Sequence, residues 1–225
     1  MKFCIINAHL PSYDAMAALT TYGNRTEYAK LHGYDLLVYK GPWTMPACHP
    51  VSWDRLRYMR EVVASGVYDW CYCCGVDTLH TNMTIGLERF TDEEHHMVVS
   101  SEWCSPIQAD SFLVKSSESG IAYLDDILSM YSEYKDNPWV EQQAMIDSLP
   151  KHRSIVKLLP QRALNSYNYS LFLEMYSWED RVRRGVDMFG NDGNWAPGDF
   201  LIHWPSLPIE VRIGEINKTL PLVVR

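Results

Sequence analysis

The stretch YDWCYCCGVDTLHTN, from Tyr68 to Asn82, follows an apolar run with a single carboxylate, Asp77. The run is predicted to form a buried strand that stops at Gly75 and turns into a polar segment. A carboxylate at the carboxyl end of such a strand is well placed to hold a divalent cation, which would neutralise a diphosphate. An aspartate in this position also commonly caps the next helix by accepting backbone N–H bonds. Both roles are open for Asp77 from this stretch alone.

Strands and helices alternate around this stretch. The periodicity of apolar residues predicts strands at 2–8, 35–39, 68–74, 96–101, 111–116, 154–159 and 199–204, and helices at 15–33, 53–65, 84–90, 118–134 and 141–149. Ser52 is the predicted N-cap of the second helix, and Gly33 and Gly66 end the first two helices.

This alternation is typical of a single α/β domain, residues 1–225, with a mostly parallel sheet covered by helices on both faces. In open sheets of this kind, ligands bind beyond the carboxyl ends of the strands, where loops and helix N-termini converge. Asp77 is expected in that position.

Composition and charge exclude several classes of protein. The chain has 225 residues, 47% of them hydrophobic, and a net charge of −8, so it is expected to bury a substantial core. Nucleic-acid binding is not expected, because it needs clustered Lys and Arg, and the short basic run at 181–184 is interpreted as a solvated helix end. No apolar stretch approaches the roughly 18 residues of a membrane span. We therefore expect a cytoplasmic protein without signal peptide or anchor.

Three of the six cysteines, Cys71, Cys73 and Cys74, crowd into one predicted strand. They are too constrained there to pair with one another, so we expect reduced and buried thiols. A zinc site is not expected, because the CYCC run lacks a second CxxC or a histidine pair at matching spacing.

Several short stretches together resemble glycosyltransferase family 34, the galactosyl-, mannosyl- and xylosyltransferases of the GT-A (Rossmann-like) fold. They occur in the family's order and at roughly its spacing between residues 24 and 204: NRTEYAKLHGYDL, SWDRLRYMREVVASGVYDW, VDTLHTNMTI, SFLVKSS, EQQAM, PQRALNSYN and WAPGDFLIHW. The resemblance implies one GT-A domain, and the absence of an anchor suggests a bacterial or viral origin.

The resemblance also implies a metal site. By position, Asp77 matches the second aspartate of the family's Asp-x-Asp motif, and His203 matches its metal-binding histidine, with Mn²⁺ or Mg²⁺ as the cofactor. The first aspartate of the motif is Gly75 here, so we expect weaker metal binding rather than none. Without context, a histidine on an apolar strand is more often a hydrogen-bonded core residue. Gly75 has a structural reading as well, because a glycine lets the backbone approach a ligand closely.

Contacts with the donor are expected at the ends of the first and third strands. Gly75, Val76 and Asp77 are the predicted donor-binding residues of the third strand, and Asn7 is placed beside the nucleotide base or in a capping role. Arg55 matches a basic position of the family and is a candidate for gripping phosphate or ribose, with an exposed helix cation as the alternative. The family's later Gly-Cys-Lys-like stretch is replaced by WPSLP, so the charge that stabilises the departing diphosphate must come from elsewhere.

The predicted catalytic residues begin the helix at 141–149. The family has acidic and amide residues at this position, on the β-face of the sugar. The resemblance implies transfer with retention, which needs a carboxylate or amide oxygen on the sugar face opposite the leaving group, and Gln142 is the first candidate, supported by Glu141. Glu141 is equally explained by the helix dipole. Gln108 and Asp110 are the predicted sugar- or acceptor-binding residues, with a turn role as the alternative for Asp110.

We therefore predict a retaining, metal-assisted glycosyltransferase that moves a hexose or pentose from a nucleotide-diphosphate sugar, with UDP as the expected nucleotide, to a hydroxyl of a glycan. The alternatives are a metal-independent relative, an inactive sugar- or nucleotide-binding protein of the same fold, and a scaffold in which Asp77 and His203 are structural. Donor sugar, acceptor, linkage and the type of retaining mechanism are open.

Overall fold

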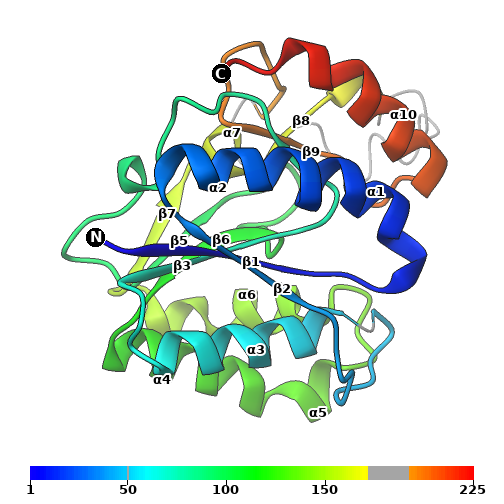
Figure 1. The fold of residues 1–225 in the computed structure, drawn as a ribbon. Coiled ribbons are helices and arrows are strands. Elements are labelled where there is room, and N and C mark those ends of the chain that lie inside the picture. The colour runs from blue at the N-terminus through cyan, green and yellow to red at the C-terminus, as the bar shows by residue number, and fades with distance from the viewer. Residues whose placement is uncertain (50, 172–192) are drawn as a thin grey trace.

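A computed structural model describes residues 1–49, 51–171 and 193–225, so the basic run at 181–184 lies outside the described residues. Its main feature is a six-stranded sheet with the order β2-β1-β3-β6-β5-β7 (Figure 1). Its strands are β1 (Phe3–Ala8), β2 (Asp35–Tyr39), β3 (Trp70–Cys74), β5 (Met97–Ser100), β6 (Ser111–Lys115) and β7 (Val156–Leu159).

The sheet is mostly parallel, as predicted. Strand β1 pairs in parallel with β2 and β3, and β5 pairs in parallel with β7. Strand β6 runs antiparallel to both of its neighbours, β3 and β5. The start of β6 therefore lies beside the end of β3.

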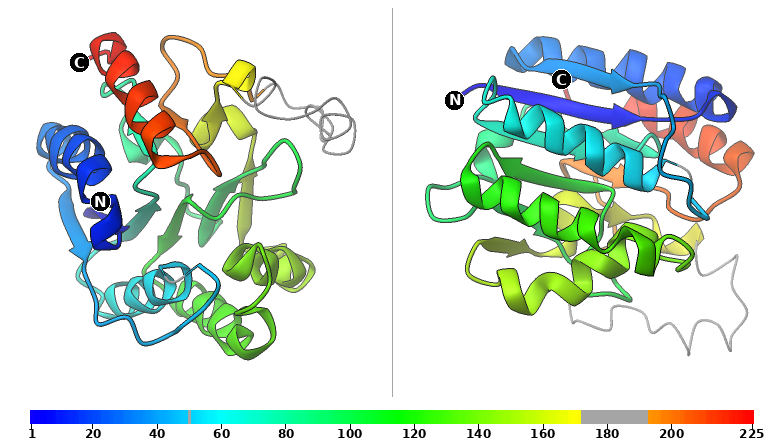
Figure 2. Two further views of the ribbon diagram at one scale, coloured as in Figure 1. Left: turned by 90° about the vertical axis from the view of Figure 1, so that its right-hand side faces the viewer. Right: turned by 90° about the horizontal axis from the view of Figure 1, so that it is seen from below.

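Helices cover both faces of the sheet, and Figure 2 shows the sheet between the two layers. One layer contains α1 (Asp14–Leu19), α2 (Thr26–His32) and α10 (Ile209–Thr219). The other contains α3 (Ser52–Ala64), α4 (Glu118–Ser129), α5 (Tyr131–Tyr134) and α6 (Val140–His152).

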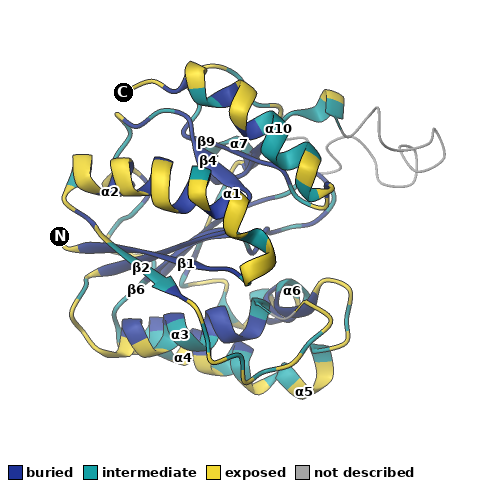
Figure 3. Ribbon diagram, turned by 45° about the vertical axis from the view of Figure 1, so that its right-hand side comes forward, coloured by how far each residue is buried: buried dark blue, intermediate teal, exposed yellow. Residues whose placement is uncertain are grey.

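Side chains of β1 alternate between two cores because successive residues of a strand point to opposite faces. Phe3 and Ile5 belong to the core beneath α1, α2 and α10, whereas Cys4 and Ile6 belong to the core beneath α3, α4 and α6. The central strands are buried on both faces, and the helices expose only their outer sides (Figure 3). This double burial explains the continuous apolar runs in the sequence.

A second, three-stranded sheet has the order β4-β9-β8. It consists of β4 (Thr78–His80), β8 (Ser166–Tyr167) and β9 (Leu201–His203), and the short helix α7 (Gln161–Leu164) precedes β8. The strand predicted at 199–204 is confirmed as β9, but it pairs with β4 and β8 instead of joining the central sheet.

Several predicted helix boundaries are wrong. Ser52 is the first residue of α3 and not its N-cap, because the preceding turn already has helical geometry and Val51 occupies the cap position. The predicted helix at 118–134 is divided into α4 and α5, and the one at 84–90 is only a 3-10 turn, Leu87–Arg89. The predicted helix at 15–33 contains a π-helical turn, Thr20–Arg25, between α1 and α2.

Two local expectations are confirmed. All six cysteines are free, and Cys4, Cys71, Cys73 and Cys74 are buried. Gly33 and Gly66 have positive φ angles of 70° and 64° at the ends of α2 and α3, which favours glycine over other residues. Within the described ranges, none of the helices has the length and apolar character needed to cross a membrane.

Candidate active site

The described residues enclose a cavity of about 400 Å³ beyond the carboxyl ends of β1 and β3. This volume is within the usual range for small-molecule sites. The segment before β6, the start of α6 and the connection from β9 to α10 complete its wall. Eight predicted site residues line it: Arg55, Gly75, Val76, Asp77, Gln108, Asp110, Glu141 and Gln142.

Pairing of β4 with β9 brings Asp77 and His203 together although they are far apart in the sequence. Thr78 lies opposite His203, and the Trp204 N–H donates to the Asp77 carbonyl at 3.1 Å. The His203 Nε2 atom is therefore 3.6 Å from Asp77 Oδ1. His203 itself is fully buried, and its ring lies behind the cavity wall formed in part by Asp77.

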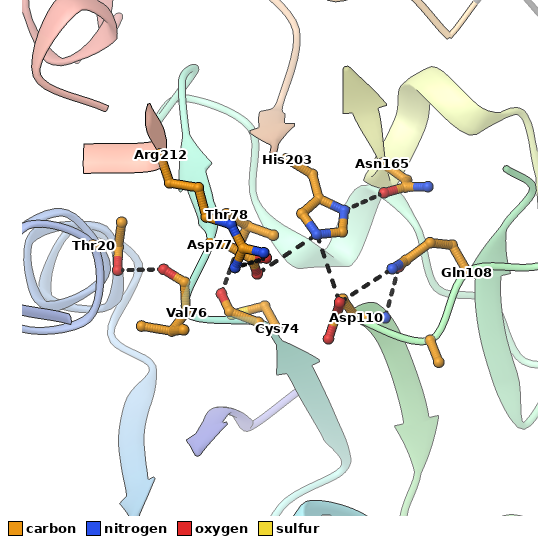
Figure 4. Close-up of polar contacts among 12 residues, drawn as sticks. Thr20, Cys74, Val76, Asp77, Thr78, Gln108, Asp110, Asn165, His203 and Arg212 are labelled. Atoms are coloured by element: carbon orange, nitrogen blue, oxygen red, sulfur yellow. Dashed lines mark hydrogen bonds and ion pairs between the residues drawn. The ribbon is translucent and has the colours of Figure 1, made fainter. Parts of the chain in front are cut away.

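Pairing of β3 with β6 brings a second carboxylate, that of Asp110, close to His203. The Gly75 N–H donates to the Asp110 carbonyl at 2.7 Å, and Asp110 Oδ2 lies 3.6 Å from His203 Nε2. Ligand atoms of Asp77, Asp110 and His203 all lie within 4.8 Å of one another, and the three side chains converge in Figure 4. Ligand atoms that share a divalent cation at about 2.1 Å lie roughly 3.0 to 3.5 Å apart, so the cluster needs little movement to hold one.

The hydrogen bond to Asn165 determines which nitrogen of His203 faces the carboxylates. The Asn165 amide nitrogen donates to the Tyr167 hydroxyl at 3.1 Å, which leaves Asn165 Oδ1 to accept from His203 Nδ1 at 2.7 Å. In the neutral imidazole, Nε2 then carries a lone pair. This buried atom has no hydrogen-bond partner among the described residues. An Nε2 atom that faces two carboxylates is favourable either with a proton on it or with a metal ion between the three groups, so the cluster fits a divalent ion.

Arg212 of α10 balances the charge of Asp77. Its Nη1 atom donates to Asp77 Oδ2 at 2.9 Å, on the oxygen that does not face His203. Burial alone raises the pKa of Asp77, but His203 and Arg212 outweigh burial and hold the pKa well below its usual range. Asp77 is therefore ionised and available as a ligand at neutral pH.

Arg55 of α3 has a different environment. It donates to Asp110 Oδ1 at 2.6 Å, to Glu141 Oε1 at 2.9 Å and to the Ala109 carbonyl at 3.2 Å. The neighbouring carboxylates raise the pKa of Arg55 despite the opposing effect of burial, which is the largest single influence. Arg55 thus links Asp110, and with it the cluster of Asp77, Asp110 and His203, to the start of α6.

The start of α6 carries the predicted catalytic residues. Val140 has a φ angle of +37°, a strained value for a β-branched residue, and such strain often marks functional sites. The Gln142 side chain accepts from the Ala109 N–H at 3.1 Å and donates to Glu102 Oε2 at 3.1 Å. These bonds orient the amide of Gln142 at the cavity wall.

Gln108 and Asn7 are placed differently by the structure. Gln108 lines the cavity and accepts from the Asp110 N–H at 2.6 Å, so it also orients Asp110. Asn7 is fully buried and does not line the cavity, and its amide donates to the Cys74 carbonyl at 2.7 Å. Ala8 and His9 occupy the wall at this strand end.

Sequence reasoning missed four residues of this region. Arg25, in the π-helical turn, supports the β3–β4 turn by donating to the carbonyls of Gly75 and Thr78. Arg25 and Asn165 lie within stretches that carry the resemblance, so a closer look at those stretches would have found them. Arg212 and Glu102 have no recognisable motif around them, and only the fold brings them to the cavity.

No protein-family model matches the chain, and no curated protein matches its sequence. Solved structures do match. The structure of a glycosyltransferase involved in glycosylation of the major capsid of PBCV-1 has a TM-score of 0.74 and 14% identity, and the match covers 97% of this chain and all of that one.

Two further glycosyltransferases have similar structures. Galactosyltransferase LgtC, in complex with donor and acceptor sugar analogues, has a TM-score of 0.59 and 12% identity over 98% of this chain and 95% of its own. GlyE of Streptococcus pneumoniae has a TM-score of 0.56 and 11% identity over all of this chain and 66% of its own. At these identities the likeness shows the fold and not membership of family 34, which stays a prediction. The chain has the α/β fold of GT-A glycosyltransferases.

Proposed function

We propose that this protein is a metal-assisted, retaining glycosyltransferase. It moves a hexose or a pentose from a nucleotide-diphosphate sugar, with UDP as the nucleotide, to a hydroxyl of a glycan. The observation that carries the proposal is the convergence of Asp77 and His203, with its unpartnered Nε2, at the wall of a cavity beyond the strand ends of a GT-A fold. The glycosyltransferases among the similar structures support transferase activity.

The diphosphate of the donor lies beside Asp77 in this proposal. Asp77 and His203 hold Mn²⁺ or Mg²⁺, which supplies positive charge to the phosphate oxygens when bound. Arg212 donates from the opposite side, because its guanidinium lines the cavity and the described residues offer it Asp77 as an acceptor. Arg212 provides the positive charge for the departing diphosphate, which the WPSLP stretch after His203 does not supply. Gly75 and Val76 border the nucleotide.

Gln142 and Glu141 act on the sugar. The bonds from Ala109 and to Glu102 hold the Gln142 amide in place, so its oxygen needs no reorganisation to face the reacting carbon. Glu141, supported by Arg55, adds negative potential on the same side. Gln108 and Asp110 line the wall where sugar hydroxyls would bind.

The acceptor glycan is assigned to the rim of the cavity formed by Trp139. Its indole is 41% exposed and lines the cavity, whereas Trp204 is fully buried and Trp103 is 9% exposed. An exposed aromatic face suits the C–H face of a pyranose ring.

Purified protein tests the proposal through thermal unfolding with a panel of UDP-sugars. We expect a rise in melting temperature that requires Mn²⁺ or Mg²⁺, because a ligand that binds only the native state stabilises it. Slow release of free sugar from one donor is the accompanying expectation. A shift without any sugar release identifies a binding protein, and release that is insensitive to EDTA identifies a metal-independent enzyme. Absence of both a shift and sugar release contradicts the proposal.

A further inference from the structure

Carboxylates crowd the space beside Gly75. A Cβ atom built at this position would lie 2.8 Å from Asp77 Oδ1 and 3.1 Å from both Cγ and Oδ1 of Asp110. Gly75 is not among the glycines with positive φ, so its backbone conformation does not demand glycine. Position 75 therefore favours glycine for steric reasons, because any side chain would displace the carboxylates of Asp77 and Asp110 from their present positions.

Asp110 enters this space from the neighbouring strand. The β3–β6 pairing places Cys74 opposite Ser111, and the bond from the Gly75 N–H to the Asp110 carbonyl continues that pairing by one residue. Arg55 holds Oδ1 of Asp110. The other oxygen, Oδ2, accepts from Gln108 Nε2 at 3.3 Å and faces His203 at 3.6 Å (Figure 4). Both oxygens of Asp110 are thus held in position, and Oδ2 is directed at the cluster.

We propose that Asp110 is a direct ligand of the divalent cation. Gly75 and Asp110 then form one unit, in which the residue after β3 has no side chain and so makes room for the carboxylate of the residue before β6. The site then consists of Asp77, Asp110 and His203. This inference rests on the proposed function for the diphosphate that the cation binds, but the set of protein ligands is testable without any sugar nucleotide.

A purely structural role for Asp110, as the ion-pair partner of Arg55, explains less. That role needs only Oδ1 and is already shared with Glu141, which accepts from the same guanidinium. The ion pair and the bond from Gln108 hold the carboxylate in place, but neither accounts for the approach of Oδ2 to a fully buried imidazole nitrogen without a partner among the described residues. A cation bound to both atoms accounts for their approach. With a side chain that is 32% exposed, Asp110 is also accessible from the cavity.

The first experiment measures Mn²⁺ binding to the protein alone by electron paramagnetic resonance of free Mn²⁺. Asp110→Asn keeps an oxygen for Arg55 but removes the charged ligand, so its affinity should fall by more than the roughly tenfold cost of losing an outer-shell partner. Asp125→Asn is the matched control, because Asp125 also pairs with an arginine but lies on the surface of α4. Unchanged affinity in Asp110→Asn, with loss in Asp77→Asn, overturns the inference and leaves the proposed function standing.

The second experiment changes Gly75 and leaves the Arg55 ion pairs intact. Gly75→Ala should weaken Mn²⁺ binding with little change in melting temperature, because the added methyl displaces flexible carboxylate ends. Gly214→Ala is its control, since a Cβ there meets nothing within 4 Å. Wild-type affinity in Gly75→Ala overturns the proposed unit.

The exchange variant Gly75→Asp/Asp110→Gly gives the sharpest result. This variant places the carboxylate directly after β3 and the glycine directly before β6, so it should bind Mn²⁺ more tightly than Asp110→Gly alone. Equal weakness of the two variants contradicts the exchange. If wild-type protein binds no Mn²⁺ even with UDP, the inference fails, whereas sugar release by EDTA-treated protein would still preserve the transferase proposal.

Discussion

Arg55 and Arg212 both line the cavity and both pair with a carboxylate of the Asp77–Asp110–His203 cluster, but their surroundings differ. Arg55 is surrounded by acceptors, with Asp110, Glu141 and the Ala109 carbonyl on its two terminal nitrogens. Arg212 donates one side-chain hydrogen bond within the described part of the chain, to Asp77, and the Nε atoms of both arginines have no partner there. Side-chain exposure is 6% for Arg55 and 13% for Arg212.

This difference indicates different roles for the side chains of Arg55 and Arg212. A guanidinium whose two terminal nitrogens already donate to acceptors holds those partners in place and has fewer donors left for a ligand. One with spare donors beside a cavity gains most when an anion binds. Arg55, predicted from the sequence as a donor contact, is therefore better explained as the support of Asp110 and Glu141, and Arg212 is the better candidate for the diphosphate.

Arg55→Met tests this comparison with the largest expected effect. The substitution leaves Glu141 buried without its cation, and removal of one partner of a buried ion pair costs about 3–5 kcal/mol of unfolding free energy. Urea denaturation measures the loss. Arg60→Met is the control, because Arg60 pairs with Asp125 at the surface and should cost about 0–1 kcal/mol. Equal losses in both variants would show that Arg55 is no internal support.

Arg212→Met should affect ligand binding more than stability. Loss of one charge-assisted hydrogen bond to phosphate is expected to weaken UDP binding by roughly 10- to 100-fold in the presence of Mn²⁺. The free energy of unfolding should fall less than in Arg55→Met, because His203 remains beside Asp77. Isothermal titration calorimetry measures the affinity, with Arg225→Met at a surface ion pair as control. If the affinity for UDP is unaltered, Arg212 does not contact the diphosphate and serves only as the counter-ion of Asp77.

Glu102 can be compared with the carboxylates that these arginines bind, because it lines the same cavity and has no arginine or lysine partner in the described residues. It accepts from the Tyr167 hydroxyl at 2.6 Å and from Gln142 at 3.1 Å. Burial raises the pKa of Glu102 despite these bonds. Because the folded-state pKa is above the unfolded value of 4.5, the stability from the protonated form is present below that pH and is lost as the pH rises through the folded-state pKa.

Glu102→Gln removes this titration and keeps one of the two acceptor oxygens. Relative to wild type, the stability of the variant should increase as the pH rises above 4.5, because the wild-type protein then loses the stability of the protonated form and the variant does not. Chemical denaturation across this range measures the difference between the two proteins, and Glu133→Gln on the exposed surface of α5 controls for the loss of one charge. A difference that does not change with pH would show that Glu102 is not destabilised by burial.

Local chemistry made much of the fold predictable. The strand at 35–39 matches β2 at both ends, and Gly33 and Gly66 stop their helices with the left-handed conformation expected of them. Helix starts were less predictable, as Ser52 shows, because the cap position depends on the turn before it. The π-helical turn that carries Arg25 was also missed, since an extra residue in a helical turn leaves no simple periodic mark.

The candidate site was predictable in part. Asp77 and His203 were identified as a pair, and the structure places them 3.6 Å apart. Asp110 was assigned to sugar hydroxyls, and its approach to the same point was not foreseen, because it follows from the antiparallel insertion of β6 beside β3. Arg212 was not identified at all, because the packing of α10 against α1 determines its position.

The sequence by itself determined which segments are buried strands, where glycines end helices, and that Asp77 would lie at a strand end, because these features depend on side chains that are close along the chain. Only the tertiary structure decided that Asp110 faces His203, that Arg55 is enclosed by acceptors and that Arg212 is not. Strand pairing and helix packing bring these charges together across long sequence separations, and a charged group's role depends on the charges and hydrogen-bond partners that surround it after folding.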